Sequence, residues 1–165
     1  MSSISLRTAK REDLYLAREI AEATWPHTYG NIISPEQISF MLDEMYSETA
    51  LQKQWEQGHC FWMAFQGAQA LGFASYGPCT TPQHYKLHKL YVLPQAQGQQ
   101  VGQRLIEQVI ADLKTCNAQQ LQLNVNRHNK ALSFYQKMGF KILKSVDIEI
   151  GKGFFMNDYV MGLEI

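Results

Sequence analysis

Residues 85–113 read YKLHKLYVLPQAQGQQVGQRLIEQVIADL, and this stretch decides the fold. Polar and apolar residues alternate up to Pro94, as in a strand, and the last part of the stretch carries apolar residues at helical spacing. A short loop with Gly98 and Gly102 joins the two elements. The unpaired amide groups and the partial positive charge at such a helix N-terminus favour binding of a phosphate group.

The loop does not match two common nucleotide-binding fingerprints. No Gly-Lys-Ser/Thr follows it, which excludes a P-loop, and the G-x-G-x-x-G pattern of a dinucleotide-binding fold is missing. Two glycines also suit a tight connection between a strand and a helix that binds nothing. The loop alone therefore leaves both interpretations open.

The rest of the chain predicts further strands and helices on both sides of this unit. Strand-like runs occupy 4–6, 59–66, 70–76, 121–125, 140–150 and 154–165, and helical spacing occurs at 10–23, 34–46, 47–57 and 129–138. This order predicts an α/β domain in three layers, a mixed central sheet of about seven strands with helices on both faces. The length supports one core, so residues 1–165 are expected to form a single domain.

The segment from Trp25 to Asn31 is aromatic and contains two helix breakers, Pro26 and Gly30. We expect a loop here, and it could either line a pocket or plug the core.

Composition narrows the class of protein. Fifteen basic and fifteen acidic residues balance, and no basic stripe suggests nucleic acid as a partner. The three cysteines have no metal or disulfide spacing, and we expect neither a metal site nor a disulfide. No segment resembles a signal peptide or a membrane span, so a cytoplasmic protein with no membrane partner is expected.

Four motifs point to a known family. They are LYVLP at 90–94, Q-x-x-Q-x-G at 97–102, NRHNKA at 126–131 and FYQKMGF at 134–140. In this order they resemble the GNAT superfamily of N-acetyltransferases. The resemblance implies acetyl-CoA as co-substrate and a partly splayed, GNAT-like sheet that holds it between two parallel strands.

The resemblance also implies which residues hold acetyl-CoA. The pantetheine arm is expected to pair with the backbone of Leu90, Tyr91 and Val92 like an added strand. The pyrophosphate is expected on the loop and helix start, at Gly98, Gln99, Gln100, Val101, Gly102 and Gln103.

Two departures from the family pattern concern this cofactor site. Gln100 stands where the family pattern has glycine, so close approach of the ligand must tolerate a Cβ atom. The family's N-x-x-A helix start is shifted as well. We expect Asn129 and Ala131 to contact the cofactor, with Asn126 as the alternative to Asn129.

Two side chains are candidates for the chemistry. Tyr135 resembles the family tyrosine whose hydroxyl faces the coenzyme sulfur and can protonate the leaving thiolate, although a packing role on the helix is the alternative. His88 lies where some members carry a glutamate base, and an imidazole of pKa about 6.5 suits proton uptake. We expect the Val92 N–H to bind the acetyl carbonyl, as the family does.

The acceptor pocket is expected to use four aromatic residues, Trp25, Tyr29, Tyr76 and Tyr85. Three carboxylates, Asp43, Glu44 and Glu48, could attract a cationic amine, or could simply form the solvated face of a helix.

Three functions remain open. We expect direct acetyl transfer to a primary amine of a small molecule, because no cysteine has an evident activating base for a covalent route. The alternatives are a non-catalytic acyl-CoA sensor or interaction module, and a protein or peptide N-acetyltransferase. The long apolar strands at the end of the chain could also pair two copies into a homodimer.

Overall fold

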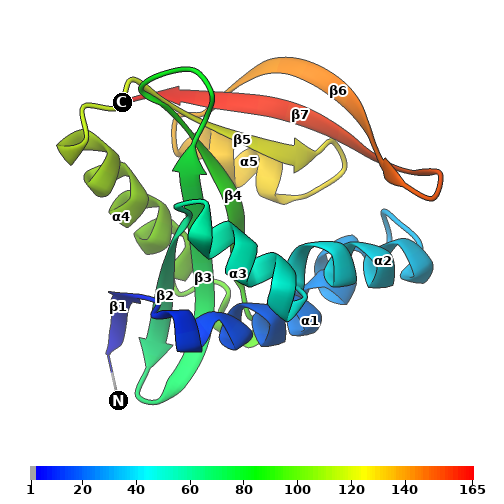
Figure 1. Ribbon diagram of the computed structural model, residues 1–165, viewed down its shortest axis with the longest axis horizontal. Helices are drawn as coiled ribbons and strands as arrows, with labels where there is room; N and C mark the ends of the chain where they lie inside the picture. The colour runs from blue at the N-terminus through cyan, green and yellow to red at the C-terminus, as the bar shows by residue number, and fades with distance from the viewer. Residues whose placement is uncertain (1–2) are drawn as a thin grey trace.

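Seven strands form one open, twisted sheet in the computed structural model, which describes residues 3–165 (Figure 1). The strands are β1 (Ile4–Thr8), β2 (Cys60–Gln66), β3 (Gln69–Pro78), β4 (His84–Val92), β5 (Gln120–Asn126), β6 (Lys141–Gly151) and β7 (Phe154–Glu164). Their order across the sheet is β1-β2-β3-β4-β5-β7-β6. The β4–β5 pair is parallel and the other neighbouring pairs are antiparallel, so the sheet is mixed as predicted.

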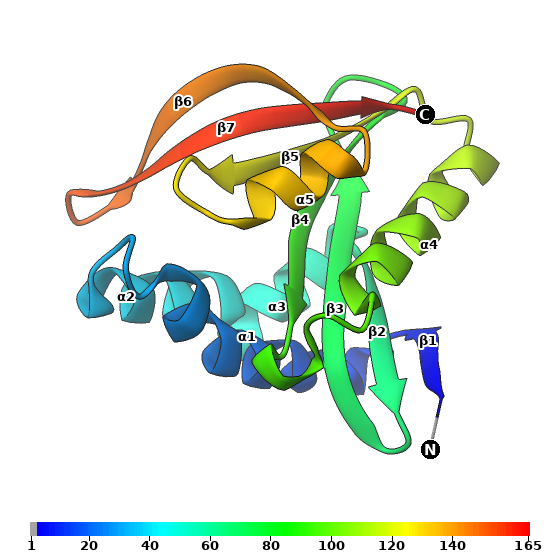
Figure 2. The same ribbon diagram turned by 180° about the vertical axis from the view of Figure 1, so that it is seen from behind.

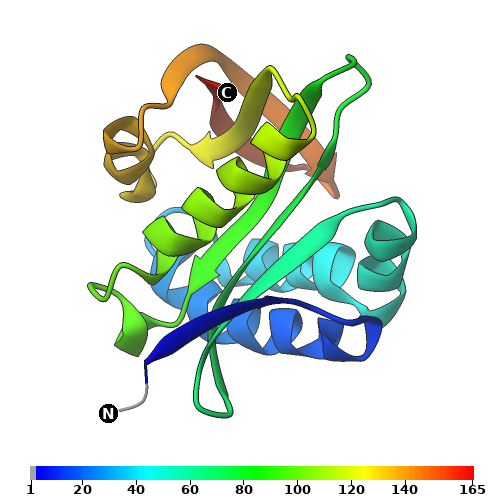
Figure 3. The same cartoon turned by 90° about the vertical axis from the view of Figure 1, so that its left-hand side faces the viewer.

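Helices cover both faces of this sheet. They are α1 (Leu14–Tyr29), α2 (Pro35–Tyr46), α3 (Glu48–Glu56), α4 (Val101–Thr115) and α5 (Ala131–Lys137), with short 3-10 turns η1 (Arg11–Asp13) and η2 (Pro94–Ala96). Figure 2 shows α4 and α5 in front of the sheet and α1 to α3 behind it, and Figure 3 shows the same layers from the side. The predicted three-layer α/β architecture is confirmed.

The pairing of β4 with β5 stops halfway along β4. Their parallel register runs only from His84 opposite Gln120 to Leu87 opposite Leu123. Beyond Leu87 the strand β4 continues to Val92 along β3, while β5 continues to Asn126 along β7. The two strands therefore diverge and leave a gap near the middle of the sheet, which is the splay that the family resemblance implied.

The aromatic segment after residue 24 is the end of a helix, so the predicted loop is wrong. Helix α1 runs through Pro26 to Tyr29 and ends at Gly30. Proline inside a helix loses one backbone hydrogen bond and costs about 3 kcal/mol. Trp25 and Tyr29, one turn apart, are both buried, and their packing against Tyr91 offsets that cost.

Two serines start the next helices. The Ser34 hydroxyl accepts a hydrogen bond from the Gln37 amide at 3.1 Å, and the Ser47 hydroxyl accepts one from the Ala50 amide at 3.1 Å. Each satisfies one of the unpaired amides of a first helical turn. The helix start that the sequence predicted at Ser34 is therefore confirmed.

The sheet edge at β6 is largely exposed. Strand β6 pairs with β7 on one side and is the last strand of the sheet. It exposes the apolar side chains Ile142, Leu143 and Ile148. The homodimer expected from these strands stays a prediction. Within residues 3–165, no helix is both long enough and apolar enough to cross a membrane.

Candidate active site

A cavity of about 1010 Å³ lies where β4 and β5 diverge. Its walls come from both faces of the sheet: from the end of α1 and the residues after it on one face, and from the starts of α4 and α5 on the other. Residues of β4 and β5 form its middle. The cavity therefore passes through the sheet, and two ligands can meet in it from opposite faces.

The N-terminus of α4 forms one end of the cavity and carries no side-chain cap. Its N-cap residue Gln100 makes no capping hydrogen bond, and Val101, Gly102 and Gln103 line the cavity. The first amides of a helix have no partner within the helix and carry partial positive charge. Uncapped amides on a cavity wall suit an anion such as a pyrophosphate.

Gln100 adopts a left-handed backbone conformation with φ +63° and ψ +20°. A residue with a Cβ atom pays about 1–2 kcal/mol for this conformation, which glycine adopts freely. Gln100 lines the cavity, so its Cβ atom lies at the cavity wall and its backbone conformation is strained. Gly98, at φ +84°, lies in the same loop with open space around its Cα hydrogen.

The free edge of β4 faces the gap. The Leu93 amide donates to the Leu71 carbonyl on β3 at 2.8 Å, so the preceding Val92 carbonyl points away from β3. The Gln97 side chain donates to that carbonyl at 3.2 Å. Backbone groups alternate along a strand, so Leu90 and Val92 present theirs to the gap, whereas those of Tyr91 face β3.

Tyr135 lies on α5 and lines the cavity. Its ring packs between Phe134 and Phe140, with centroid distances of 5.4 and 5.8 Å. Burial, aided by the nearby Tyr29, raises the pKa of the Tyr135 phenol, so the hydroxyl keeps its proton throughout the physiological range. The Tyr135 hydroxyl is therefore a protonated group on a residue that lines the cavity.

His88 also lines the cavity, at the first β4 position after the pairing with β5 ends. Its ring stacks on His59 at 4.2 Å, and its buried Nε2 atom has no hydrogen-bond partner among residues 3–165. Burial, together with His59, Lys86 and Lys89, lowers the pKa of His88 to about 3. The near-neutral pKa assumed from the sequence is therefore absent, and His88 is a neutral acceptor at pH 7.

Most of the residues predicted to hold acetyl-CoA come together in this cavity. The lining includes Leu90, Tyr91, Val92, Gly98, Gln100, Val101, Gly102, Gln103, Asn129, Ala131 and Tyr135, and Gln99 lies outside it. Asn129 caps the start of α5, because its side chain accepts from the Ala131 amide at 2.9 Å. Asn126 holds the preceding turn by accepting from the His128 amide at 2.9 Å, and lies outside the lining.

Of the four aromatic residues predicted for the acceptor pocket, only Tyr29 lines the cavity. Trp25 is 1% exposed and packs beneath Tyr29 and Tyr91. Tyr76 donates to Asp112 on α4 at 2.8 Å, outside the cavity. Tyr85 lies on the part of β4 that still pairs with β5 and is also outside the lining.

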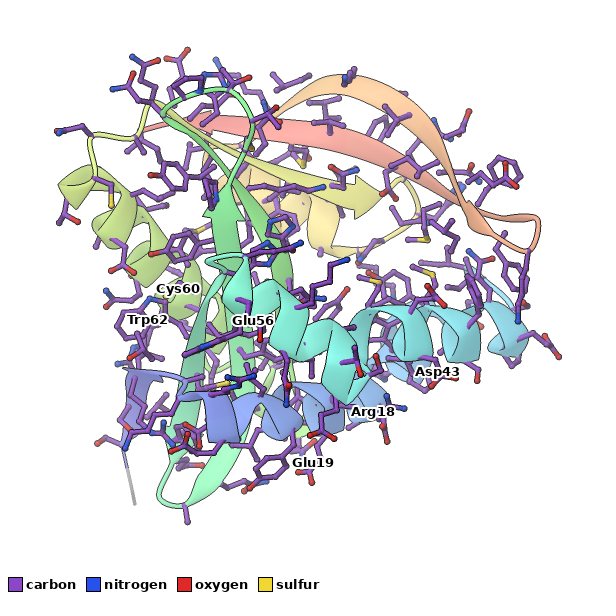
Figure 4. The ribbon with its side chains drawn as sticks, viewed as in Figure 1. Arg18, Glu19, Asp43, Glu56, Cys60 and Trp62 are labelled. Atoms are coloured by element: carbon purple, nitrogen blue, oxygen red, sulfur yellow. The ribbon has the colours of Figure 1, made fainter. Side chains whose placement is uncertain are left out.

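The carboxylates proposed to attract an amine also lie outside the cavity lining. Asp43, Glu44 and Glu48 are exposed on α2 and α3. Asp43 pairs with Arg18 of α1 at 3.2 Å, and Figure 4 shows the two side chains beside these helices. They form a solvated helix face, which was the alternative interpretation of the sequence.

Sequence reasoning missed several lining residues, among them Asn31, Ile32, Asn124, His128, Lys130 and Phe134. Phe134 lies in the quoted FYQKMGF motif, so that motif offered a signal for it. No sequence motif indicated Asn124, because its position beside the gap depends on where the pairing of β5 with β4 ends. Among the described residues, no group of three or more His, Cys, Asp or Glu side chains could hold a metal ion.

Comparison with known proteins decides the family. The sequence profile of the family described as Acetyltransferase (GNAT) domain matches residues 31–158, well over half of the chain. The chain belongs to this GNAT acetyltransferase family. The match includes the diverging strands, the α4 loop and Tyr135, which all contribute to the observed cavity.

A curated protein and a solved structure, both from Thermoplasma acidophilum, are similar to this chain. A spermidine N(1)-acetyltransferase is 30% identical over 146 residues, which cover 85% of this GNAT chain and 89% of the relative. The crystal structure of a PaiA N-acetyltransferase in complex with coenzyme A matches 99% of both chains, with a TM-score of 0.83 and 27% identity. The crystal structure of a GCN5-related N-acetyltransferase from Rhodopseudomonas palustris has a TM-score of 0.83 and 23% identity. The match covers 100% of this chain and 98% of that chain, and it supports the fold.

Proposed function

We propose that this GNAT enzyme transfers the acetyl group of acetyl-CoA directly to a primary amine of a small molecule, with a polyamine as the best candidate. The observation that carries the proposal is the single cavity that opens to both faces of the sheet. Acetyl-CoA would enter along α4 and α5, and the amine would enter beside Tyr29 at the end of α1. The likeness to a spermidine N(1)-acetyltransferase supports a polyamine acceptor.

Acetyl-CoA fits the α4 side of the cavity. Its pyrophosphate would accept hydrogen bonds from the uncapped amides around Gly102, and its pantetheine would pair with the free edge of β4 at Leu90 and Val92. Lys130 and His128 also line the cavity and are basic side chains suited to phosphate oxygens. Every phosphate contact in this proposal comes from backbone amides, the Lys130 side chain or the His128 ring.

Two groups would assist the transfer itself. The amine nitrogen attacks the thioester carbon, and the Val92 N–H stabilises the oxyanion that forms. When the carbon–sulfur bond breaks, the Tyr135 hydroxyl gives its proton to the departing thiolate, and the phenol regains a proton from water. The chain supplies its proton donor on α5 and its oxyanion donor on β4, on opposite sides of the gap.

His88 would orient the amine as a hydrogen-bond acceptor. Its Nε2 atom is buried and has no partner among the described residues, and its lowered pKa keeps it neutral. An imidazole with a pKa of about 3 is too weak a base to hold a proton taken from an alkylammonium. The acceptor would therefore bind as the neutral amine, and the proton released after attack would pass to water.

The experiment is a thiol-release assay with acetyl-CoA and a panel of acceptors: spermidine, amino acids, aminoglycosides and short peptides. Rapid release with spermidine and not with peptides supports the proposal. Thiol release only with peptides would contradict the proposal and would indicate a protein or peptide N-acetyltransferase. No release, together with tight acetyl-CoA binding by calorimetry, would indicate the non-catalytic sensor.

A further inference from the structure

We propose that Asp158 binds a second, cationic nitrogen of the acceptor, so that the enzyme prefers diamines and polyamines to monoamines. The inference rests on the proposed function, because it names the group that selects among small amines. Asp158 lies on β7 and is outside the groups so far assigned to acetyl transfer.

Asp158 lies on the face of the sheet that α1 and α2 cover. Side chains two residues apart on a strand share a face, so Asp158 shares its face with Met156. The Gln37 amide on α2 contacts the Met156 sulfur at 3.8 Å, which places α2 over that face. This is the side of the sheet from which the amine would enter.

Asp158 also adjoins two residues that line the cavity. It pairs directly with Asn126 on β5, so Asn124 is its diagonal neighbour on the same face. The negative charge of Asp158 contributes to raising the pKa of the Tyr29 hydroxyl, after the larger effect of burial, which shows that the two groups are close. Asn124 and Tyr29 both line the cavity, so Asp158 adjoins the lining without being part of it.

The Asp158 carboxylate is buried, which raises its pKa, and it is only partly paired, through a hydrogen bond with the Asn124 side chain. The residue is 6% exposed, and its Oδ1 atom has no hydrogen-bond partner among residues 3–165. A buried carboxylate oxygen without a partner is costly, and a cation that reaches it gains a charge-assisted hydrogen bond. The structure thus contains an unused acceptor for a positively charged group beside the cavity.

The cations of the protein itself leave this oxygen unpaired. Arg127, whose charge acts on Asp158, forms its ion pair with Asp147 on β6. The Lys89 ammonium donates to Gln54 at 2.9 Å and lies over the Tyr46 ring. Lys86 acts on Asp158 through its charge, without an ion pair among the described residues.

The cavity lining contains no Asp or Glu residue among positions 3–165. A bound diamine has one nitrogen that must be neutral to attack and another that keeps its charge near pH 7, since alkylamines have pKa values near 10.4. Asp158, the buried carboxylate beside Asn124, would meet that second nitrogen when the Tyr29 or Asn124 side chain moves aside.

The test compares 1,4-diaminobutane with butylamine, which has the same four-carbon chain and a single nitrogen. For the wild-type enzyme we expect kcat/KM to be at least tenfold higher for the diamine. In Asp158→Asn, which keeps the shape and removes the charge, this ratio is expected to fall at least tenfold. The control Glu149→Gln, which neutralises an exposed carboxylate on β6, should leave the ratio unchanged.

The outcomes separate the two proposals. If wild-type enzyme acetylates neither amine, nor any other in the panel, the proposed function fails. If it acetylates both amines equally well, or if Asp158→Asn keeps the wild-type ratio, the role of Asp158 is wrong while the function stands. A purely structural role would lower both rates together and leave the ratio unchanged, and equal wild-type rates for the two amines would overturn the proposal even if the variant does not fold.

Discussion

The hydroxyl oxygens of Tyr29 and Tyr91 lie 3.0 Å apart and join the end of α1 to β4 at the wall of the cavity. Both rings are packed around Trp25, at centroid distances of 4.8 and 5.7 Å. The aromatic cluster thus fixes the acceptor side of the site to the strand that is proposed to hold acetyl-CoA.

Removing one hydroxyl of this pair should destabilise the protein. In Tyr91→Phe, the buried Tyr29 hydroxyl loses one of its hydrogen-bond partners, and we expect the free energy of unfolding to fall by about 1 kcal/mol. Urea denaturation measures the change. Tyr15→Phe is the matched control, because Tyr15 is 60% exposed, and it should leave stability unchanged. Equal effects of the two substitutions would contradict a structural role for the pair.

Gln100→Gly should stabilise the protein. Glycine relieves the strain of the left-handed conformation, and this gain exceeds its entropic cost, so the free energy of unfolding is expected to rise by about 1 kcal/mol. Gln99→Gly in the same loop, whose φ is not positive, is expected to lower stability instead. If Gln100→Gly lost as much stability as Gln99→Gly, the left-handed conformation of Gln100 would not be strained.

Tyr135→Phe should reduce turnover while acetyl-CoA still binds. Without the phenolic proton the thiolate leaves unprotonated, and we expect kcat to fall about 10²-fold, within the range of general acid catalysis. The ring and its contacts with Phe134 and Phe140 remain, so the Kd for acetyl-CoA from calorimetry should stay within about threefold. Unchanged kcat between pH 6 and 9 would eliminate Tyr135 as the acid.

The pH dependence of the reaction should follow the acceptor amine. His88, with a pKa lowered by burial to about 3, is already deprotonated above pH 5 and does not titrate in the working range. The neutral fraction of an alkylamine rises about tenfold per pH unit below its pKa near 10.4. We therefore expect kcat/KM for spermidine to rise steadily from pH 6 to pH 9. A plateau above an inflection near pH 6.5 would instead identify an imidazole base.

Much of the fold could be predicted because the local signals and the tertiary structure agree. The alternation before Pro94, the apolar stripe of α4 and the Ser34 cap each follow from spacing and hydrogen bonding within a few residues. The end of α1 could not be predicted in the same way. Pro26 is a local helix breaker, and only the packing of Trp25 against the distant Tyr91 keeps the segment helical.

In the candidate site, too, some residues could be predicted from local sequence and others depend on tertiary structure. Tyr135 and the α4 loop belong to contiguous motifs, so the sequence reveals them without a structure. Asn124 and Asp158 lie beside the cavity only because β5 leaves β4 and pairs with β7. Tyr76 and Tyr85, chosen for their aromatic character, lie outside the lining. The lowered pKa of His88 likewise depends on tertiary structure, first through burial and then through His59, which directly precedes β2.

The most direct test of the central claim is calorimetric titration of Gly98→Pro with acetyl-CoA, beside the wild-type protein. Gly98 has φ +84°, which proline cannot adopt, and the substitution also removes one amide from the proposed pyrophosphate seat. Gly153→Pro, at φ +76° in the β6–β7 turn, is the matched control for the backbone change. We predict that wild-type and Gly153→Pro proteins bind acetyl-CoA alike and that Gly98→Pro binds at least tenfold more weakly. Equal affinity of Gly98→Pro and wild type, or no binding by wild type, would contradict the placement of acetyl-CoA at the start of α4.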